Sequence, residues 1–433
     1  MPSGDTIFAL SSGAPPAAIA TIRISGSLAK QTLATLTGAL PSERQAALRS
    51  LRDPADGRLL DRAVVIWFAG PATATGEDLV ELHLHGGRAV VRAVETALAN
   101  MPGLRMAEPG EFTRRAFSNG RIDLAEAEGL GDLLLAETEA QRVAALRMAS
   151  GHLSRLANRW REAVLRLSAM VEAELDFSDE DDVDTGADET LRVLTLELAA
   201  EIDAVLARPH AERLKDGIRV VLAGPPNAGK STLLNALVQR DAAIVSDIAG
   251  TTRDIIAVPV AYDGVPFVFS DTAGLRDDHG DGIEAIGIAR AQDAIATADI
   301  VLWLGVPDGI PQHPAVWQIA AKVDRADVSR ETADVARHLV SALTGEGIDA
   351  LIADLVASAR QLLPAPEDLA LNARQHRLIS QCGVSLHDAA GQSDPLIRAE
   401  ALRQARAAID SLLGHSHVED MLDTLFGRFC IGK

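Results

Sequence analysis

The sequence of 433 residues contains little cysteine and few aromatic residues. Its two cysteines, Cys382 and Cys430, are too few for a disulfide framework and are typical of a reducing compartment such as the cytoplasm. Aromatic residues make up 3% of the chain and hydrophobic residues 47%, so we expect cores of aliphatic side chains and alanine-rich helices. The histidines show no metal-like pairing with cysteine.

Long apolar runs are missing as well. No stretch approaches the roughly 18 residues that a membrane-spanning helix needs, so no membrane span is expected. Residues 1–10 contain Asp5 and lack a basic segment, so we expect no secretory signal peptide. Together with the scarce cysteine, these absences predict a cytoplasmic protein.

Positive charge is outweighed by negative charge, since 41 Lys and Arg residues stand against 61 Asp and Glu residues and the formal net charge is −20. A strongly acidic chain is not the usual nucleic-acid binder. The charge is unevenly distributed, however. Residues 142–166 carry six arginines against one acidic residue. Such a stretch can contact phosphate, but we favour its interpretation as a solvated helix face. Residues 172–189 carry ten acidic residues and no lysine or arginine, which is typical of a hinge or connector.

A phosphate-binding loop is the most informative motif present. Residues 224–231 read Gly-Pro-Pro-Asn-Ala-Gly-Lys-Ser and fit the G-x-x-x-x-G-K-[ST] pattern of P-loop nucleotidases. The apolar run 219–223 before the motif predicts a buried strand, and residues 232–237 after it are good helix formers. In such loops the lysine, here Lys230, reaches the β- and γ-phosphates, and the hydroxyl, here Ser231, is offered to Mg²⁺.

Further elements of a guanine-nucleotide site follow in order. Asp271-Thr272-Ala273-Gly274 ends the apolar run 265–269, which predicts a second strand. Asp271 is placed to hold Mg²⁺ through water, and Gly274 to bring a backbone N–H to the γ-phosphate. Residues 250–254 (Gly-Thr-Thr-Arg-Asp) form a candidate switch segment whose threonine hydroxyl completes the Mg²⁺ shell.

The base-reading motif departs from the usual Asn-Lys-x-Asp, since residues 321–324 read Ala-Lys-Val-Asp. Asp324 can still accept hydrogen bonds from guanine, and Lys322 can lie along the base. We expect the missing asparagine to weaken binding by about 1–2 kcal/mol if one hydrogen bond is lost. Ser341-Ala342-Leu343 fits the loop on the base side of such domains.

A second departure concerns the attacking water. Many GTPases place glutamine directly after the glycine of Asp-x-x-Gly, whereas this chain has Leu275, which cannot orient water. Glu284, in the polar stretch 276–284, is the candidate replacement. Spacing alone favours a solvated surface carboxylate at this position.

Four regions are predicted, and together they indicate a multidomain protein. Residues 1–118 mix short β-type runs with helical segments, which predicts an α+β domain, and residues 119–213 read as long helices. Residues 216–360 alternate strands and helices, as in an α/β P-loop GTPase domain of the Ras-like kind. Residues 365–433 are helical again, so the GTPase domain is inserted between two helical stretches that can pack into one all-α domain.

Several further motifs occur along the chain in a specific order. They are Thr75-Gly76-Glu77-Asp78, His83-Leu84-His85-Gly86-Gly87, Pro109-Gly110-Glu111-Phe112-Thr113, residues 115–124, Asp176-Phe177, residues 247–254 and the terminal Phe429-Cys430-Ile431-Gly432-Lys433. With the P-loop, this ordered set resembles the MnmE (also called TrmE) family of tRNA-modification GTPases over nearly the whole length. A P-loop alone indicates only a superfamily, whereas the ordered set indicates one family.

The resemblance implies a homodimer whose N-terminal domains, residues 1–118, bind a tetrahydrofolate derivative, the 5-formyl or 5,10-methylene form, that supplies one carbon. The family acts with the flavoprotein MnmG, which alone carries FAD, in a heterotetramer. Together they install an aminomethyl or carboxymethylaminomethyl group at C5 of the wobble uridine, position 34, of certain tRNAs. The positions that match the family's folate contacts are Arg23, Glu81, Arg121 and Lys433.

The resemblance also implies K⁺ and Mg²⁺ beside the nucleotide. The matching K⁺ positions are Asn227, Ser246, Ile248 and Thr251; the Mg²⁺ positions are Ser231 and Thr252. Glu284 matches the water-orienting glutamate, which makes Glu284 and Lys230 the implied catalytic residues. The implied GTP-binding set is Asn227, Ala228, Gly229, Lys230, Ser231, Thr232, Ser246, Asp247, Ile248, Ala249, Gly250, Thr251, Thr252, Asp271, Thr272, Ala273, Gly274, Lys322, Asp324, Ser341, Ala342 and Leu343.

The chain departs from the family in the folate domain. Residues 13–18 read Gly-Ala-Pro-Pro-Ala-Ala where the family has a glycine- and arginine-containing loop, and proline restricts the backbone there. Arg121 replaces a more usual lysine and keeps its charge. His83 and His85 have no assigned role, and we interpret both as structural.

Two other functions fit parts of the sequence. A ribosome-associated or RNA-binding regulatory GTPase would carry the nucleotide motifs without folate binding. A folate-dependent one-carbon transferase regulated by GTP would transfer carbon without a flavoprotein partner.

Overall fold

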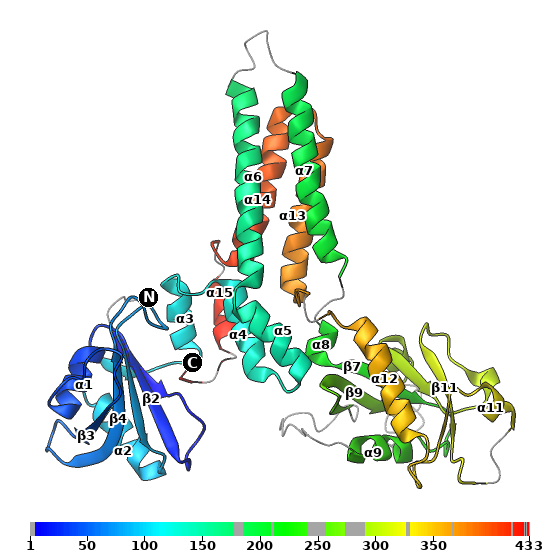
Figure 1. Cartoon of the computed structure of the whole chain (residues 1–433), viewed down its shortest axis with the longest axis horizontal. Helices are drawn as coiled ribbons and strands as arrows, with labels where there is room; N and C mark the ends of the chain where they lie inside the picture. Colours follow the sequence, from blue (N-terminus) through cyan, green and yellow to red (C-terminus); the bar gives the residue numbers. More distant parts are fainter. Residues whose placement is uncertain are drawn as a thin grey trace, which may run out of the picture. The chain divides into compact units, whose positions relative to one another are not determined.

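The computed structural model describes residues 5–176, 185–208, 212–240, 257–272, 291–325, 330–365, 368–416, 419–427, 429 and 431–432 (Figure 1). The chain divides into two compact units. The first comprises Met1–Gly131, Ser154–Asn158 and Asp410–Lys433, and the second comprises Asp132–Leu153 and Arg159–Ile409. The finer boundaries predicted from the sequence remain a proposal.

A six-stranded sheet forms the first unit, in the order β3-β4-β5-β2-β1-β6. All neighbours are antiparallel except β1 and β6, which are parallel. The strands are β1 (Thr6–Leu10), β2 (Ile19–Ser25), β3 (Ala47–Arg52), β4 (Leu59–Phe68), β5 (Leu79–His85) and β6 (Leu104–Met106). Helices α1 (Ala29–Thr37) and α2 (Arg88–Ala99) contribute Leu33, Val91 and Val94 to its core.

Strand alternation gives this sheet two chemically different faces. Ile22 and Ile24 of β2 and Leu82 of β5 are fully buried in the core with α1 and α2. The residues between them, including Arg23 and Glu81, therefore point to the opposite face, because successive side chains in a strand alternate. That face carries the predicted folate residues of the two strands.

The chain end packs inside the first unit. Helices α3 (Glu111–Ser118), α4 (Leu124–Leu135) and α15 (Glu419–Phe426) meet around a small core that includes Leu124, Phe426 and Phe429. Gly110, before α3, has φ +67°, and a Cβ there would lie 2.2 Å from the carbonyl oxygen of Phe426. Glycine at the Pro-Gly-Glu motif thus permits the close approach of α15.

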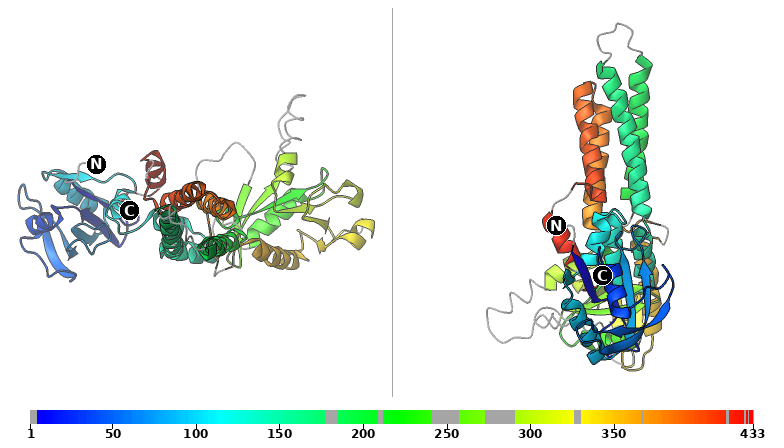
Figure 2. Two further views of the ribbon diagram at one scale, coloured as in Figure 1. Left: turned by 90° about the horizontal axis from the view of Figure 1, so that it is seen from above. Right: turned by 90° about the vertical axis from the view of Figure 1, so that its left-hand side faces the viewer.

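Long helices from both sides of the GTPase region run side by side in Figures 1 and 2. They are α6 (His152–Asp176), α7 (Thr185–Leu206), α13 (Ala373–Gly391) and α14 (Pro395–Leu413), with the shorter α5 (Glu139–Ala149) and α8 (Glu212–Asp216) nearby in sequence. Arg398 of α14 is buried and pairs with Glu174 of α6 at 3.1 Å and Asp188 of α7 at 2.6 Å. None of the helices that the structure describes is long and apolar enough to cross a membrane.

The inserted region is an α/β domain with a six-stranded sheet in the order β12-β11-β10-β7-β9-β8. Among its described strands, β8 alone runs antiparallel to its neighbour. The elements are β7 (Ile218–Ala223), α9 (Lys230–Arg240), β8 (Ala257–Tyr262), β9 (Val265–Asp271), β10 (Ile300–Trp303), the 3₁₀ turn Pro307–Gly309, β11 (Val316–Ala321), α11 (Arg330–Val335), β12 (His338–Val340) and α12 (Ile348–Leu362). The predicted fold class, α+β, all-α and P-loop α/β, is confirmed.

Candidate functional site

The phosphate-binding loop connects the end of β7 to the start of α9. Two of its glycines adopt positive φ, with Gly224 at +149° and Gly229 at +101°. A Cβ on Gly224 would lie 3.1 Å from the backbone of Leu304, and one on Gly229 would lie 3.2 Å from the Lys322 side chain. Glycine at these two positions therefore allows both the positive φ and the close approach of neighbouring atoms. Lys230 is buried and folds back over the loop, donating to the carbonyl oxygens of Gly224 at 3.0 Å and Pro225 at 2.9 Å.

The end of β9 brings its aspartate to the start of α9. Ser231 Oγ donates a 2.5 Å hydrogen bond to Asp271 Oδ2, and the Asp271 side chain is buried. Thr272 follows, with its backbone N–H and its Oγ1 both donating to the carbonyl oxygen of Leu222, at 3.2 and 3.1 Å. These bonds attach the motif after β9 to the central strand. A hydroxyl and a carboxylate in contact are hard oxygen ligands of the type that Mg²⁺ prefers.

A pocket of about 580 Å³ opens over this loop. Its lining residues are Gly224, Pro226, Asn227, Gly229, Lys230, Ser231, Thr232, Thr272, Lys322 and Arg325. Among the described residues, the lining carries three cationic side chains and no carboxylate, and the first turn of α9 adds the positive end of a helix. This combination suits a polyphosphate. The sequence motifs explain Lys230 and Lys322, but they gave no reason to select Arg325.

The base-side residues lie on the loops after β11 and β12. Ser341 is fully buried, and its Oγ donates to Asp324 Oδ1 at 2.6 Å. This hydrogen bond is the main cause that lowers the pKa of the Asp324 carboxyl, with smaller contributions from Arg325 and Lys322. Lys322 has φ +63°, and its Nζ donates to the backbone carbonyl of Asn227 in the P-loop. The structure thus joins the base loop to the phosphate loop, although Ala321 offers no side-chain amide.

Several predicted site residues lie outside the described residues. In the GTPase domain these are Ser246, Asp247, Ile248, Ala249, Gly250, Thr251, Thr252, Ala273, Gly274 and Glu284, and at the chain end Lys433. Cys430, to which no role is assigned, lies outside them as well. Among the described ones, Leu343 is 83% exposed, whereas its neighbour Ser341 is buried. Ala342 is half-buried between them. Their roles stay predictions.

In the first unit, the register of the sheet joins two predicted folate residues. Arg23 of β2 lies directly opposite Glu81 of β5, and Arg23 Nε donates to Glu81 Oε1 at 2.9 Å. His83, two residues along β5, lies 3.1 Å from Glu81 Oε2 through its Nε2. Burial raises the pKa of Glu81, but the hydrogen bonds from His83 and Arg23 outweigh this effect and lower it. Arg121 follows α3 and lies close to Gly76, since a Cβ added to Gly76 would lie 3.3 Å from Arg121 Cγ.

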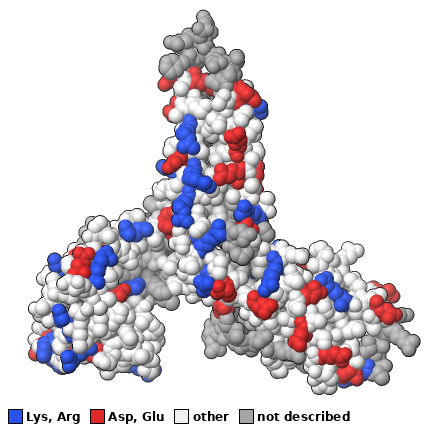
Figure 3. All heavy atoms as spheres, in the orientation of Figure 1, with Lys and Arg blue, Asp and Glu red and all other residues white. Residues whose placement is uncertain are grey.

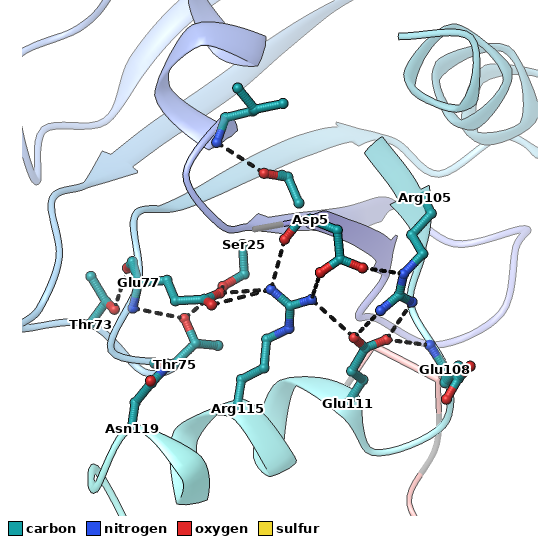
Figure 4. Close-up of polar contacts among 12 residues, drawn as sticks. Asp5, Ser25, Thr73, Thr75, Glu77, Arg105, Glu108, Glu111, Arg115 and Asn119 are labelled. Atoms are coloured by element: carbon teal, nitrogen blue, oxygen red, sulfur yellow. Dashed lines mark hydrogen bonds and ion pairs between the residues drawn. The ribbon is translucent and has the colours of Figure 1, made fainter. Parts of the chain in front are cut away.

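The family-like motifs of the first unit form one polar network, drawn in Figure 4. Arg115 donates to Glu77, Glu111 and Asp5, at 3.1, 3.1 and 2.8 Å for the closest pairs. Ser25 Oγ donates to Glu77 at 2.7 Å and lies 2.7 Å from Thr75 Oγ1.

Two more side chains, those of Arg105 and Asn119, extend this network. Arg105 binds Glu111 with both terminal nitrogens and Asp5 with Nε, and Asn119 Nδ2 donates to the carbonyl oxygen of Thr75 at 2.7 Å. Burial raises the pKa of Glu111, whereas hydrogen bonds from Arg105, the Glu108 N–H and Arg115 lower it by more. The motifs at residues 75–78, 109–113 and 115–124 therefore hold one another in place.

The His-Gly-Gly motif holds the proline-containing loop. A Cβ on Gly86 would lie 2.2 Å from the carbonyl oxygen of Ala17, and Ala17 N–H donates to the Gly86 carbonyl at 3.0 Å. Arg88 Nε also donates to the Pro15 carbonyl at 3.2 Å. His85 bonds Asp61 through its backbone N–H at 2.9 Å and its Nδ1 at 2.8 Å. These contacts agree with the structural interpretation of His85.

Cys382 and the arginine-rich stretch 142–166, both noted in the sequence, have ordinary surroundings. Cys382 is buried in α13, and burial raises the pKa of its thiol to about 12, so it is not a nucleophile at neutral pH.

Figure 3 shows basic and acidic side chains in stripes along the helical bundle. Within the arginine-rich stretch, Arg142 pairs with Glu139 at 2.6 Å and Arg159 lies 3.4 Å from Glu201. Such exposed pairs agree with a solvated helix face.

Comparison with known proteins decides the family. Residues 6–121 match the model described as GTP-binding protein TrmE N-terminus, and residues 124–430 match the MnmE helical domain. The chain belongs to the MnmE family. A relative from Novosphingobium aromaticivorans, described as tRNA modification GTPase MnmE, is 58% identical over 99% of this chain and 100% of its own length.

Other MnmE-family members are similarly close. The tRNA modification GTPase MnmE of Erythrobacter litoralis is 59% identical over 99% of this chain and 100% of its own length. That of Rhizorhabdus wittichii is 56% identical over 100% of this chain and 97% of its own length. The similarity extends across both compact units, so the MnmE resemblance predicted from the ordered motifs is confirmed.

Proposed function

We propose that this chain is a GTP-hydrolysing enzyme of tRNA modification. The observation that carries the proposal is the convergence of Lys230, Ser231, Asp271 and Asp324 on the carboxyl ends of parallel strands in a member of the MnmE family. Ligands of open α/β sheets bind at this edge. A pocket whose described lining includes Lys230, Lys322 and Arg325 fits a nucleoside triphosphate.

In and around that pocket we assign roles by chemistry. Lys230 and the loop N–H groups bind the β- and γ-phosphates, and Asp324 reads the base as an ionised acceptor oriented by Ser341. Ser231 and Thr252 are proposed as Mg²⁺ ligands, with Asp271 acting through water. The metal ion would neutralise charge developing on the phosphates. Glu284 would orient the attacking water in place of the usual glutamine.

A potassium ion is proposed beside the phosphates, held by Asn227, Ser246, Ile248 and Thr251. Asn227 lines the pocket and has φ +62°, a conformation that asparagine adopts more readily than most residues. When bound, the ion offsets charge between the β- and γ-phosphates, as an arginine finger does in other GTPases.

A tetrahydrofolate derivative is proposed for the polar sheet face of the first unit. The residues fit such a ligand, because Glu81 keeps an ionised carboxylate that can accept from the N–H groups of a pterin. Arg23, Arg121 and Lys433 would add cationic groups for its carboxylates. The bound 5-formyl or 5,10-methylene form would supply one carbon.

The oligomeric state, partner, compartment and product are proposed from family membership. The chain would form a homodimer through residues 1–118 and act in the cytoplasm with the flavoprotein MnmG, which carries FAD. The product would be an aminomethyl or carboxymethylaminomethyl group at C5 of the wobble uridine of certain tRNAs.

The deciding experiment uses a strain without this gene, complemented with wild type or Lys230→Ala, and mass spectrometry of tRNA nucleosides. We expect the C5-modified wobble uridine to return with wild type and not with the variant. Unchanged nucleosides in the deletion strain would favour a regulatory GTPase. Modification that persists without the flavoprotein would favour a folate-dependent transferase.

A further inference from the structure

Arg325 lines the phosphate pocket, yet no motif accounts for it. It directly follows the base-reading Asp324 and shares the pocket lining with Lys230, Ser231 and Lys322. Asp324 itself is not part of that lining. The side chain of Arg325 is exposed. The pocket therefore receives a third positive charge from the base loop.

The backbone explains how this side chain reaches the pocket. Arg325 N–H donates to the Lys322 carbonyl oxygen at 2.9 Å, which closes a tight turn over residues 322–325. Lys322 begins the turn with φ +63°, and its Nζ donates to the Asn227 carbonyl oxygen of the P-loop. The turn thus places Arg325 beside the link between base loop and phosphate loop.

Arg325 differs from other arginines of this domain in its ion pairing. Arg213 pairs with Asp299 at 2.7 Å, Arg337 with Asp354 at 2.7 Å, and Arg360 with Asp263 at 3.9 Å. In the part of the chain that the structure describes, Arg325 forms no salt bridge, and the adjacent Asp324 accepts from Ser341. Among the described residues its guanidinium makes no hydrogen bond either, so its five donors are available to a ligand in the pocket that Arg325 lines.

We propose that Arg325 is a further nucleotide-binding residue whose guanidinium binds a phosphate oxygen of GTP. The inference rests on the proposed GTP site and deepens it. A guanidinium presents a planar fork that matches phosphate oxygens, and hydrogen bonds between ionised partners are about twice as strong as neutral ones. Such a contact offsets affinity lost with the side-chain amide that Ala321 lacks.

The test measures GTP and GDP dissociation constants by calorimetry for full-length wild type, Arg325→Gln and Arg325→Lys. Arg360→Gln is the matched control, because it removes one exposed arginine charge outside the pocket lining. We expect Arg325→Gln to weaken both nucleotides about tenfold and Arg325→Lys less, with Arg360→Gln unchanged. Added salt should reduce the difference in nucleotide dissociation constant between wild type and Arg325→Gln.

A second arm separates phosphate binding from base reading. If Arg325 contacts phosphate, Arg325→Gln weakens GTP and XTP by the same factor, and Ala321→Asn in the same chain restores GTP affinity through the base. An unchanged GTP dissociation constant in Arg325→Gln, or a loss confined to GTP, would overturn the proposal. Absence of GTP binding by wild type, or equal binding by Lys230→Ala, would instead refute the underlying GTP site.

Discussion

Ser231 Oγ lies 2.5 Å from Asp271 Oδ2, which joins the first turn of α9 to the end of β9. The two residues are separated by 40 positions in the sequence, and the parallel pairing of β7 with β9 brings them together. Their oxygens are the groups that we propose to hold Mg²⁺, directly and through water. The pairing of the two strands therefore brings the two side chains together.

Asp271→Asn tests this relationship. Removing the charge should raise the Mg²⁺ concentration for half-maximal GTP hydrolysis by about tenfold, because the amide binds a hard cation less tightly than a carboxylate. GTP binding in EDTA should persist. Asp308→Asn, which changes an exposed aspartate of the same domain, is the control. A Mg²⁺ titration of phosphate release that gives identical curves for wild type and Asp271→Asn would remove Asp271 from the metal site.

Potassium dependence is the second prediction. Wild-type GTP hydrolysis should be at least about tenfold faster in KCl than in NaCl at matched ionic strength, because the proposed site selects an ion by size beside Asn227. In Asn227→Ala the difference should shrink while GTP still binds. Phosphate release measured in both salts is sufficient. Equal wild-type rates would count against the potassium assignment.

The polar network of the first unit is the third prediction. Arg115→Leu leaves Glu77, Glu111 and Asp5 close together without their shared cation. We expect a loss of about 2 kcal/mol of local stability at pH 7, less than for a fully buried pair because water screens part of the network. Hydrogen exchange of peptides from β5 and α3 would report it. Arg114→Leu is the control, since its partner Asp423 is 60% exposed.

The same network predicts how the local stability of the first unit changes with pH. Burial raises the pKa of Glu111 and of Asp5, but the hydrogen bonds from their arginines lower both by more, below 4.5 and 3.8 respectively. Carboxyls with a lowered folded-state pKa contribute stability above their unfolded pKa, and this contribution is lost as pH falls through the folded value. As the pH is lowered past about 4.5, hydrogen-exchange protection of β5 and α3 should therefore decrease in wild type, and it should decrease less steeply in Arg115→Leu. Identical pH profiles would contradict the role of Arg115.

The nucleotide site could be predicted because its residues occupy fixed positions after successive strands. Spacing alone located Lys230, Ser231 and Asp271, and the structure brings all three together. The contacts in the first unit depend instead on tertiary packing, since Arg115 and Asp5 are separated by 110 positions. Register decides that Arg23 faces Glu81, and no local pattern in either strand specifies that partner. Arg325 was missed for another reason, because a turn, rather than a motif, directs it to the pocket.

Base reading is the last prediction. Asp324 accepts a 2.6 Å hydrogen bond from Ser341, which lowers the pKa of its carboxyl, and we propose that it accepts from the guanine N1–H and 2-amino groups. Asp324→Asn should shift preference toward XTP, because an amide can donate to the 2-carbonyl of xanthine. Ala321→Asn should tighten GTP binding roughly tenfold by recovering one hydrogen bond of about 1.4 kcal/mol. Titrating GTP, XTP and ATP against both variants and wild type measures these ratios. An unchanged GTP-over-XTP ratio in Asp324→Asn would show that another residue reads the base, because no remaining group of the motif at residues 321–324 distinguishes the two purines.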